Sequence, residues 1–335
     1  MRDMEARPIS DGRVQHATSL WCEGIGTYGL REAPIPPSRD GEVRLAALWS
    51  AVSRGTERLV LEGRVPPAEA ERMRCPHQDG AFPFPVKYGY ALVGRVEVGP
   101  LDLVGRTAFA LHPHQTHVIL PREAILPVPD GVPPRRATLA ANMETALNVV
   151  WDSGAGPGDR VLVLGAGVVG LMAARLLART PGTEVTVADR DERKAAAAGA
   201  MGARFADLDR LPRGVDVVVD ATGSGEALAD AIDAAALEAR IVVAGWLGAG
   251  TAAVPLGGAF HSLRLALVSS QVGRVPQHRA PRWTQARRLA KALELLGDAA
   301  LDALFTHELA LADAPRELPR LLAGDTGALA ITLRY

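Results

Sequence analysis

The chain has 335 residues, of which 48% are hydrophobic and 22% are charged, and its formal net charge is −1. This length predicts two domains with buried cores, and the near-zero charge excludes the basic surface expected of a nucleic-acid-binding protein. The two cysteines, Cys22 and Cys75, exclude a disulfide framework and favour a reducing, cytoplasmic location.

The first part of the chain, to about residue 147, predicts irregular β structure. Met1–Ser10 is charged and has no apolar core, so we expect no signal peptide. Short apolar runs separated by glycine and proline then predict strands of a small barrel or sandwich. These runs are Val43–Leu48, Ala91–Val98, Thr107–Leu111 and Val118–Leu120.

A nucleotide-binding unit begins at Arg160. Arg160–Leu164 predicts a buried parallel strand, which runs into the glycine turn Gly165-Ala166-Gly167-Val168-Val169-Gly170 and a helix over Leu171–Thr180. In such a turn the first glycine permits the tight bend, the second lets a pyrophosphate approach, and the third lets helix and strand pack closely. The helix N-terminus presents unpaired N–H groups to the phosphate. A strand over Glu184–Ala188 and an acid, Asp189, complete the pattern, which predicts a dinucleotide site.

Alternating strands and helices continue beyond this unit and predict a doubly wound parallel sheet. Residues 241–260 carry no charge but contain several glycines, which indicates a strand and a loop rather than a membrane helix. The predicted helices are Asp191–Ala200, Gly225–Leu237 and Pro281–Leu296, and the predicted strands are Val215–Asp220, Arg240–Ala244, Leu263–Gln271 and Ala328–Arg334.

Asp189 favours NAD over NADP as the cofactor. A carboxylate at the end of the second strand accepts hydrogen bonds from the ribose 2′-hydroxyl and repels a 2′-phosphate. Arg190, Arg193 and Lys194 lie nearby, so a compensating cation stays an alternative. Asp189 would also serve as a cap for the helix that follows it.

Several further motifs, in chain order, resemble those of the medium-chain dehydrogenase/reductase superfamily, which is alcohol-dehydrogenase-like. They are Glu42–Leu45 with Ser53–Glu57, Gly89–Gly99, Thr145–Leu147 with Gly156–Asp159, and the C-terminal Phe260-His261, Ser269–Val272, Pro281–Thr284 and Thr306-His307. The C-terminal motifs resemble the branch that includes bacteriochlorophyllide hydroxyethyl dehydrogenase.

The resemblance implies an α/β fold, in which a Rossmann doubly wound sheet accompanies a GroES-like β-barrel catalytic domain. The implied boundaries are 1–147 for the catalytic domain, 148–272 for the NAD-binding domain and 273–335 for a segment that returns to the catalytic domain. It also implies a homodimer formed through the last Rossmann strand, Leu263–Gln271.

The zinc sites of the superfamily are not matched by this sequence. The structural zinc needs four cysteines, and the chain has two. The catalytic ligand positions correspond to Arg54, Tyr90 and Ala141, which are not a zinc ligand set. We therefore expect no metal at either site.

A different group of candidate metal ligands in the sequence consists of histidines and a cysteine. His112, His114 and His117 alternate along a predicted strand, with Cys75 and His77 upstream. No acid or cysteine lies beside the three histidines, so a structural role for them is the favoured alternative.

Without zinc, the substrate oxygen needs a hydrogen-bond donor or a fixed positive charge. Thr56 aligns with the hydroxyl that relays protons in zinc-dependent relatives, and Tyr90 would donate its phenol proton to the substrate. Lys87 or Arg54 would lower the pKa of Tyr90 or bind the oxygen, and Glu57 would orient Arg54 or its loop. Alternatively, Tyr90 lines the barrel, Thr56 caps a helix, and Arg54 and Glu57 form a surface ion pair.

The resemblance also implies further contacts to the cofactor. Thr145 resembles the residue that packs against the nicotinamide. Trp246, Ser269 and Ser270 lie where relatives bind the carboxamide, although Trp246 would serve equally in a core. Ala330 stands where the terminal strand often carries a basic residue, so no cofactor contact is expected from it.

These features together predict a zinc-independent, NAD-dependent oxidoreductase that interconverts a secondary alcohol and a ketone on a small organic substrate. One alternative is an NADPH-dependent reductase of an activated C=C or C=N bond. Another is a dinucleotide-binding module without turnover. No nucleic-acid or membrane partner is expected.

Overall fold

The computed structural model describes residues 15–324 and 326–335. The Met1–Ser10 segment, expected not to be a signal peptide, lies outside this range. The chain divides into two compact units. The first runs to Leu139 and also includes Glu308–Gly324 and Ile331–Tyr335, and the second covers Ala140–His307 and a short return through Ala330.

The first unit is built from antiparallel strands. One sheet has the order β2-β1-β5-β4, and the other has the order β16-β17-β3-β6-β7-β9, with β8 also paired to β3. Their bounds are β1 His16–Gly24, β2 Thr27–Pro34, β3 Glu42–Val52, β4 Asp79–Gly80, β5 Val86–Lys87, β6 Leu92–Val98, β7 Thr107–Ala110, β8 His117–Pro121, β9 Ile125–Pro127, β16 Phe305–Ala310 and β17 Ala330–Arg334.

The predicted short strands of this unit are present, and their inward residues form its core. Val43 and Leu45 of β3 pack with Leu92 and Val96 of β6 and with Val118 of β8. The sequence analysis did not predict the long β1–β2 hairpin. Its strands alternate only partly between buried and exposed residues, which weakens the strand signal.

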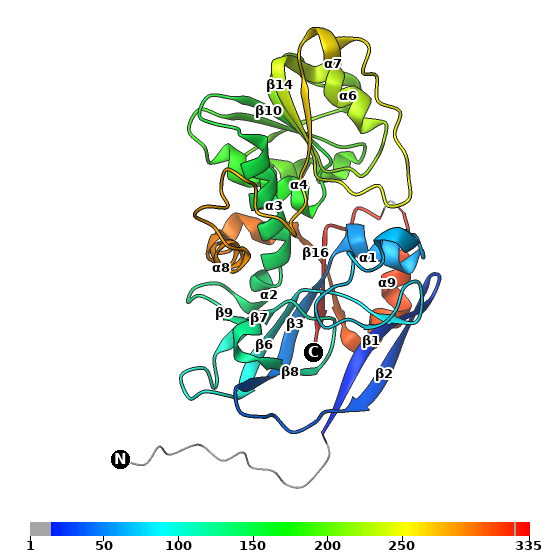
Figure 1. Ribbon diagram of the computed structural model, residues 1–335, viewed down its shortest axis with the longest axis vertical. Helices are drawn as coiled ribbons and strands as arrows, with labels where there is room; N and C mark the ends of the chain where they lie inside the picture. Colours follow the sequence, from blue (N-terminus) through cyan, green and yellow to red (C-terminus); the bar gives the residue numbers. More distant parts are fainter. Residues whose placement is uncertain (1–14, 325) are drawn as a thin grey trace. The chain divides into compact units, whose positions relative to one another are not determined.

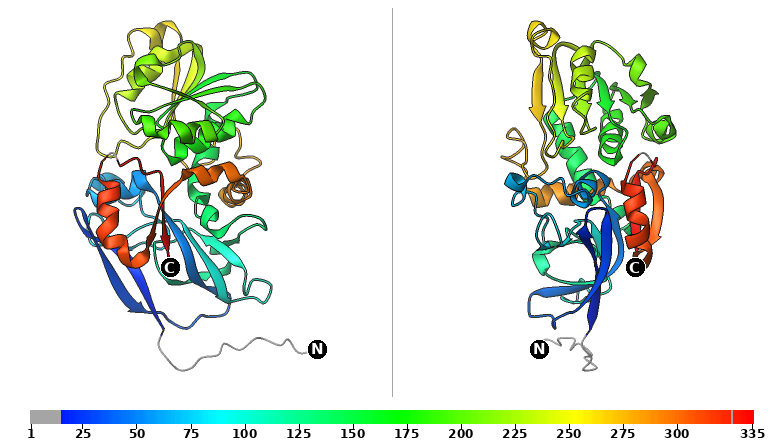
Figure 2. Two further views of the ribbon diagram at one scale, coloured as in Figure 1. Left: turned by 180° about the vertical axis from the view of Figure 1, so that it is seen from behind. Right: turned by 90° about the vertical axis from the view of Figure 1, so that its right-hand side faces the viewer.

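Short helices connect these strands. They are α1 Arg54–Leu61, η1 Pro67–Glu69, η2 Arg122–Ala124, α2 Pro134–Ala137, η6 Leu311–Asp313 and α9 Ala314–Leu322. Helix α9 lies against β2, although more than 270 residues separate them in sequence (Figure 2). The C-terminal part of the chain thus belongs to the same unit as its beginning.

The second unit contains a parallel sheet with the order β12-β11-β10-β13-β14-β15. This is the strand order of the Rossmann fold. The strands are β10 Arg160–Leu164, β11 Glu184–Ala188, β12 Arg204–Ala206, β13 Val215–Asp220, β14 Ala235–Val243 and β15 Ala266–Ser269. Leu164 is in register with Ala188 and with Asp220, so the glycine turn and Asp189 leave the sheet at its carboxyl edge.

Helices precede, connect and follow the strands of this sheet. They are α3 Ala140–Ser153, α4 Val168–Ala178, η3 Glu192–Lys194, α5 Ala195–Ala200, η4 Leu208–Arg210, α6 Ala227–Ala234, α7 Ala259–Ser262, α8 Gln285–Leu295 and η5 Ala299–Leu304. Within the described residues, no helix combines the length and the apolar character needed to cross a membrane.

Helix α6 is shorter than the predicted Gly225–Leu237, because Ala235 already belongs to β14. Ala235 pairs with Val215 of β13, and the left-handed backbone of Glu238, with φ of 58°, lets β14 change register before it continues. Long-range strand pairing therefore overrides the helical propensity of this alanine-rich stretch.

Helix α8 begins at Gln285 rather than near Pro281, because the Thr284 side chain caps it by accepting from Arg287 N.

A buried arginine joins α8 to α3. Arg288 is 1% exposed and donates from Nε to Glu144 Oε1 at 3.0 Å, and its other nitrogens donate to Asn148 Oδ1 and the Val272 carbonyl. Figure 1 shows α8 beside α3. These bonds place residues 273–307 in the same unit as the Rossmann sheet, whereas the predicted boundaries assigned them to the catalytic domain. The predicted boundary at 147 lies inside α3.

Replacing Arg288 with methionine should destabilise the second unit. Glu144 would lose its partner, and breaking a buried pair from one side costs about 3–5 kcal/mol. Burial raises the pKa of Glu144, and Arg288 opposes that rise. In the variant the folded state would therefore bind a proton more readily than the unfolded state, so the defect in unfolding free energy should shrink as pH falls.

Chemical denaturation of the intact chain at several pH values measures this defect. Arg287→Met on the exposed side of α8 is the matched control. It should cost less than about 1 kcal/mol, because the contacts that it loses, with the Trp283 ring and the Arg282 carbonyl, are made by an exposed side chain. Equal losses in the two variants would contradict the assigned role of Arg288.

Candidate functional site

The glycine turn leaves an open approach at one glycine and close packing at the other two. A Cβ on Gly165 would lie 3.0 Å from the Ala221 carbonyl carbon, and one on Gly170 would lie 2.1 Å from the Gly165 oxygen. A Cβ on Gly167 would meet nothing within 4 Å. Val168 and Val169 begin α4 and are partly exposed. The turn therefore fits a pyrophosphate that approaches the backbone at Gly167 and the start of α4.

Asp189 is held by three hydrogen bonds. Its Oδ2 accepts from Ala166 N at 2.8 Å and from Lys194 Nζ at 2.9 Å, and its Oδ1 accepts from Asp191 N at 2.9 Å. Asp191 caps the next turn and bonds to Arg193, whose hydrogen bond lowers the pKa of the Asp191 carboxyl. Arg190 is exposed. A carboxylate has about four acceptor positions, so the described residues leave one position on Oδ1 of Asp189 unused.

The other residues predicted to contact the cofactor differ in their hydrogen bonds and in their exposure to solvent. The Thr145 hydroxyl donates to the Ala141 carbonyl at 3.0 Å within α3. The Ser270 hydroxyl donates to Asp152 Oδ2 at 2.6 Å, which leaves backbone groups as its means of contacting a cofactor. Ser269 ends β15 and is exposed, and Trp246 is half-buried after β14. Ala330 is buried in the core at the start of β17.

One acid at this edge of the sheet was missed by the sequence analysis. Asp220 ends β13 beside Leu164, is fully buried, and accepts from the Thr222 backbone and hydroxyl through Oδ1. Its Oδ2 has no hydrogen-bond partner among the described residues. Burial raises the pKa of Asp220. The signal in the sequence was an acid at a strand end, the same signal that identified Asp189.

In the first unit, three hydroxyl groups meet around Tyr90. The Tyr90 phenol donates to Ser53 Oγ and lies 3.3 Å from Thr56 Oγ1. Ser53 precedes α1 and Thr56 lies in its first turn, so the start of this helix carries both partners. Loss of solvent raises the pKa of Tyr90 to about 12, although the two hydrogen bonds oppose that rise. Tyr90 therefore stays a neutral proton donor across the physiological range.

A buried polar chain supports this hydroxyl cluster. Glu57 Oε1 accepts from Ser53 N at 2.7 Å, and Oε2 lies 3.1 Å from His114 Nε2. The other ring nitrogen of His114 lies 2.7 Å from Ser50 Oγ, which is 2.9 Å from the Tyr335 hydroxyl. Glu57, His114 and Ser50 are almost completely buried. Glu57 thus holds the loop before α1 rather than Arg54, and it does not form a surface ion pair.

The two expected cations do not contact the Tyr90 phenol. Lys87 Nζ lies 2.5 Å from Asp79 Oδ2 and donates to Gln115 Oε1 at 2.9 Å. Arg54 donates to the Gly324 carbonyl. Neither contributes to the pKa of Tyr90, which rises rather than falls. Electrostatic activation of Tyr90 by Lys87 or Arg54 is therefore not part of this arrangement.

The residues present do not fit a catalytic zinc. The guanidinium of Arg54 and the methyl group of Ala141 offer no donor, and the raised pKa of Tyr90 opposes the phenolate that a metal would bind. In the rival set, His112 Nδ1 bonds to the Pro113 carbonyl, and both ring nitrogens of His114 are bonded as described. Across residues 15–324 and 326–335, no three His, Cys, Asp or Glu side chains are grouped to hold a metal.

Known structures share this fold at low sequence identity. L-idonate 5-dehydrogenase from Escherichia coli K-12 is 15% identical, with a TM-score of 0.78 over 96% of this chain and 99% of that chain. An alcohol dehydrogenase from E. coli CFT073 in complex with NADH is 18% identical, with a TM-score of 0.75 over 96% and 99%. A putative zinc-binding dehydrogenase from Sinorhizobium meliloti 1021 bound to NADP is 18% identical, with a TM-score of 0.76 over 96% and 100%. This likeness confirms the predicted α/β fold, in which a Rossmann doubly wound sheet accompanies a second, β-rich domain.

A family match covers the part of the chain that contains the dinucleotide turn. Residues 140–317, which are 178 of the 335, match the family described as glucose dehydrogenase C-terminus. The matched segment includes the parallel sheet, Asp189 and α8. The chain therefore belongs to the glucose dehydrogenase C-terminus family, a family of nicotinamide-dependent dehydrogenases.

Proposed function

We propose that this protein is an NAD(H)-dependent oxidoreductase that interconverts a secondary alcohol and a ketone without zinc. The observation that carries the proposal is the hydroxyl cluster of Tyr90, Ser53 and Thr56, which supplies a proton donor where relatives would use a metal. The glycine turn and Asp189 support the nicotinamide half of the reaction. The resemblance to the bacteriochlorophyllide dehydrogenase branch favours a ring-bearing, natural-product-type substrate.

When bound, a nicotinamide cofactor would supply a hydride to the carbonyl carbon of a ketone or accept one from the carbinol carbon of an alcohol. The chain's own residues handle the proton on oxygen. A phenol has one hydrogen, so Tyr90 donates to either Ser53 or Thr56 at a given moment, and the three hydroxyls can pass a proton among themselves. In ketone reduction, Thr56 or Tyr90 protonates the developing alkoxide, and in alcohol oxidation the same groups accept that proton.

The hydrogen bonds of Asp189 support NAD over NADP as the cofactor. Lys194 and two backbone N–H groups donate to its carboxylate and leave an acceptor position on Oδ1. A ribose 2′-hydroxyl would donate to that position, whereas a 2′-phosphate would meet negative charge. Because Lys194 neutralises part of this charge, the discrimination between NAD and NADP depends on both Asp189 and Lys194.

We also propose a cytoplasmic homodimer that pairs through β15. In the described sheet β15 is an outer strand next to β14, and Leu267 is 38% exposed. An open strand edge presents unpaired backbone groups to a second copy. Sedimentation of the purified protein tests the dimer.

Asp189→Asn should weaken NADH binding about tenfold and narrow the preference for NADH over NADPH, because one charge-assisted hydrogen bond is worth about 1.5 kcal/mol. Fluorescence titration of the two reduced cofactors measures both constants. Asp209→Asn, an exposed acid on the same unit, is the matched control. Tighter binding of NADPH than NADH by the natural chain would refute the assignment and favour the C=C or C=N reductase.

Tyr90→Phe and Thr56→Val should each lower kcat for ketone reduction by about 100-fold, since a positioned proton donor contributes roughly 10²–10⁴. A panel of cyclic and aryl methyl ketones with NADH provides the assay. Tyr88→Phe is the control, because the Tyr88 phenol donates to the Met73 carbonyl and lies outside the hydroxyl cluster. Since the pKa of Tyr90 is about 12, the natural enzyme should show no loss of its neutral donor below about pH 10.

Unchanged kcat in both variants, with NADH bound tightly, would instead indicate a binding module without turnover.

The purified protein should contain far less than one zinc ion per chain, and a chelator such as 1,10-phenanthroline should leave its ketone reduction unchanged. The reason is that the expected ligand positions carry Arg54, Tyr90 and Ala141. Elemental analysis by plasma mass spectrometry measures the metal. Stoichiometric zinc whose removal abolishes activity would rule out the proposed proton transfer.

A further inference from the structure

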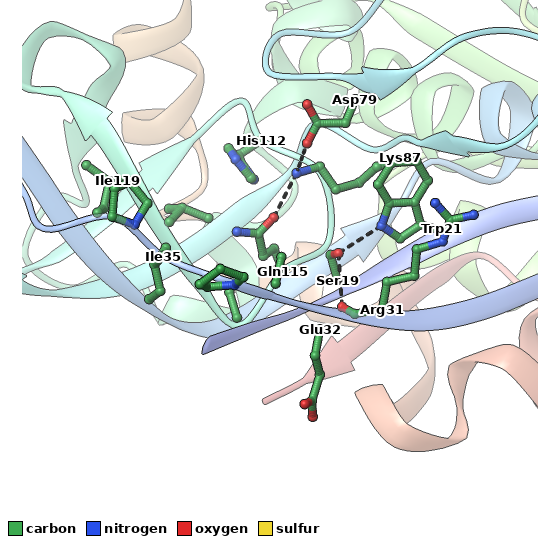
Figure 3. A pocket seen from close by; sticks show the side chains of 15 residues that line it. Ser19, Trp21, Arg31, Glu32, Ile35, Asp79, Lys87, His112, Gln115 and Ile119 are labelled. Atoms are coloured by element: carbon green, nitrogen blue, oxygen red, sulfur yellow. Dashed lines mark hydrogen bonds and ion pairs between the residues drawn. The ribbon is translucent and has the colours of Figure 1, made fainter. Parts of the chain in front are cut away.

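A cavity of about 370 Å³ lies within the first unit, apart from the Tyr90 cluster. Strands β1 and β2 and the Pro34–Pro36 turn form one side, and residues of β4, β5 and β8 form the other (Figure 3). Its volume is in the range of small-molecule pockets. Tyr90, Ser53 and Thr56 are not among the described residues that line it.

Lys87 contributes a buried donor to this cavity. Its side chain is 9% exposed, and its ammonium contacts Asp79 Oδ2 at 2.5 Å and Gln115 Oε1 at 2.9 Å. An ammonium group has three hydrogens, and the described residues account for two of them. Asp79 balances the charge of Lys87, so the cavity offers an N–H donor without a net positive charge.

His112 contributes a buried acceptor. The residue is 5% exposed, and its Nδ1 lies 2.8 Å from the Pro113 carbonyl. A carbonyl can only accept, so Nδ1 carries the hydrogen and Nε2 presents a lone pair. Within the described structure Nε2 has no hydrogen-bond partner. Burial lowers the pKa of His112 to about 3, and the charge of Lys87 acts in the same direction, so the ring stays neutral.

The remaining walls suit a ligand with an apolar face. The Trp21 ring lines the cavity, with its indole N–H already donated to Ser19 Oγ at 2.9 Å. The Arg31 guanidinium lies 4.1 Å from the centre of that ring and is bonded to Glu23. Ile35 and Ile119 add aliphatic surface, as Figure 3 shows.

A donor and an acceptor in one cavity match a hydroxyl group, whose oxygen accepts from Lys87 Nζ while its hydrogen is donated to His112 Nε2. An anion is disfavoured because Asp79 already neutralises Lys87 and because Glu32 also lines the cavity. A cation gains little from Asp79, because that carboxylate is already paired with Lys87. We propose that this cavity binds a neutral, hydroxylated small molecule of the cyclic polyol or sugar class, at a site distinct from the proposed catalytic cluster.

The test measures binding to the full-length protein without NAD(H), so it does not depend on the proposed reaction. Titration with myo-inositol, followed by the indole N–H signal of Trp21 in a ¹⁵N-tryptophan-labelled sample, should give a saturable shift. Tetrahydropyran, a ring without hydroxyl groups, and gluconate, an anion, should bind at least about fivefold more weakly. D-glucose serves as the second hydroxylated probe.

Three variants locate the site. His112→Phe removes the acceptor but keeps an aromatic ring against His77, Lys87→Met removes the donor, and Ile119→Trp fills the cavity from its rim. Each should weaken binding of myo-inositol about fivefold or more, whereas Tyr90→Phe and the surface variant Arg204→Met should not. Thermal melting establishes that each variant is folded.

The proposal fails if neither myo-inositol nor D-glucose gives a saturable Trp21 shift, or if the folded cavity variants bind as the natural chain does. Binding that is lost in Tyr90→Phe would also overturn it, because the ligand would then occupy the catalytic cluster. A failed ketone assay would leave this result unaffected.

Discussion

The buried carboxylate of Glu57 fixes the geometry of the hydroxyl cluster in the first unit. Both of its oxygens are used, one by Ser53 N before α1 and the other by His114. A buried carboxylate requires such partners because leaving it unpaired costs several kcal/mol. The start of α1 is therefore held in place, and with it Ser53 and Thr56, the two hydroxyls that contact Tyr90. The proposed proton donor thus rests on a carboxylate that takes no part in the chemistry.

In the second unit, a carboxylate also holds loops in place, at the carboxyl edge of the sheet. Asp189 bonds to Ala166 N in the glycine turn and to Asp191 N in the next loop. One side chain therefore ties together the two loops that would surround the adenosine half of a dinucleotide. Lys194 compensates its charge from a position that is itself almost buried. The proposed preference for NAD and the structure of these loops consequently depend on the same carboxylate, so they cannot vary independently.

Local sequence signals predicted this second unit better than the first. The strands Arg160–Leu164, Glu184–Ala188 and Val215–Asp220 have the predicted bounds, because each is a short, mainly apolar run rich in branched residues with a turn or an acid at its end. The network of Glu57, His114, Ser50 and Tyr335 was not predicted, because it joins positions up to 285 residues apart. Lys87 lies near Tyr90 in sequence, but strand geometry directs its ammonium to Asp79 and Gln115.

Gly89 shows how tightly the first unit is packed around His114. A Cβ at this position would lie 2.9 Å from His114 Nε2, the same nitrogen that faces Glu57, and the backbone there has φ of 131°. A side chain at position 89 would therefore be excluded twice, by the imidazole of His114 and by a backbone conformation that only glycine adopts readily. Replacing His114 removes only the first barrier, so a redesign of this unit has to keep Gly89 or rebuild the backbone around it, and it has to supply Glu57 with a new partner once the imidazole is gone.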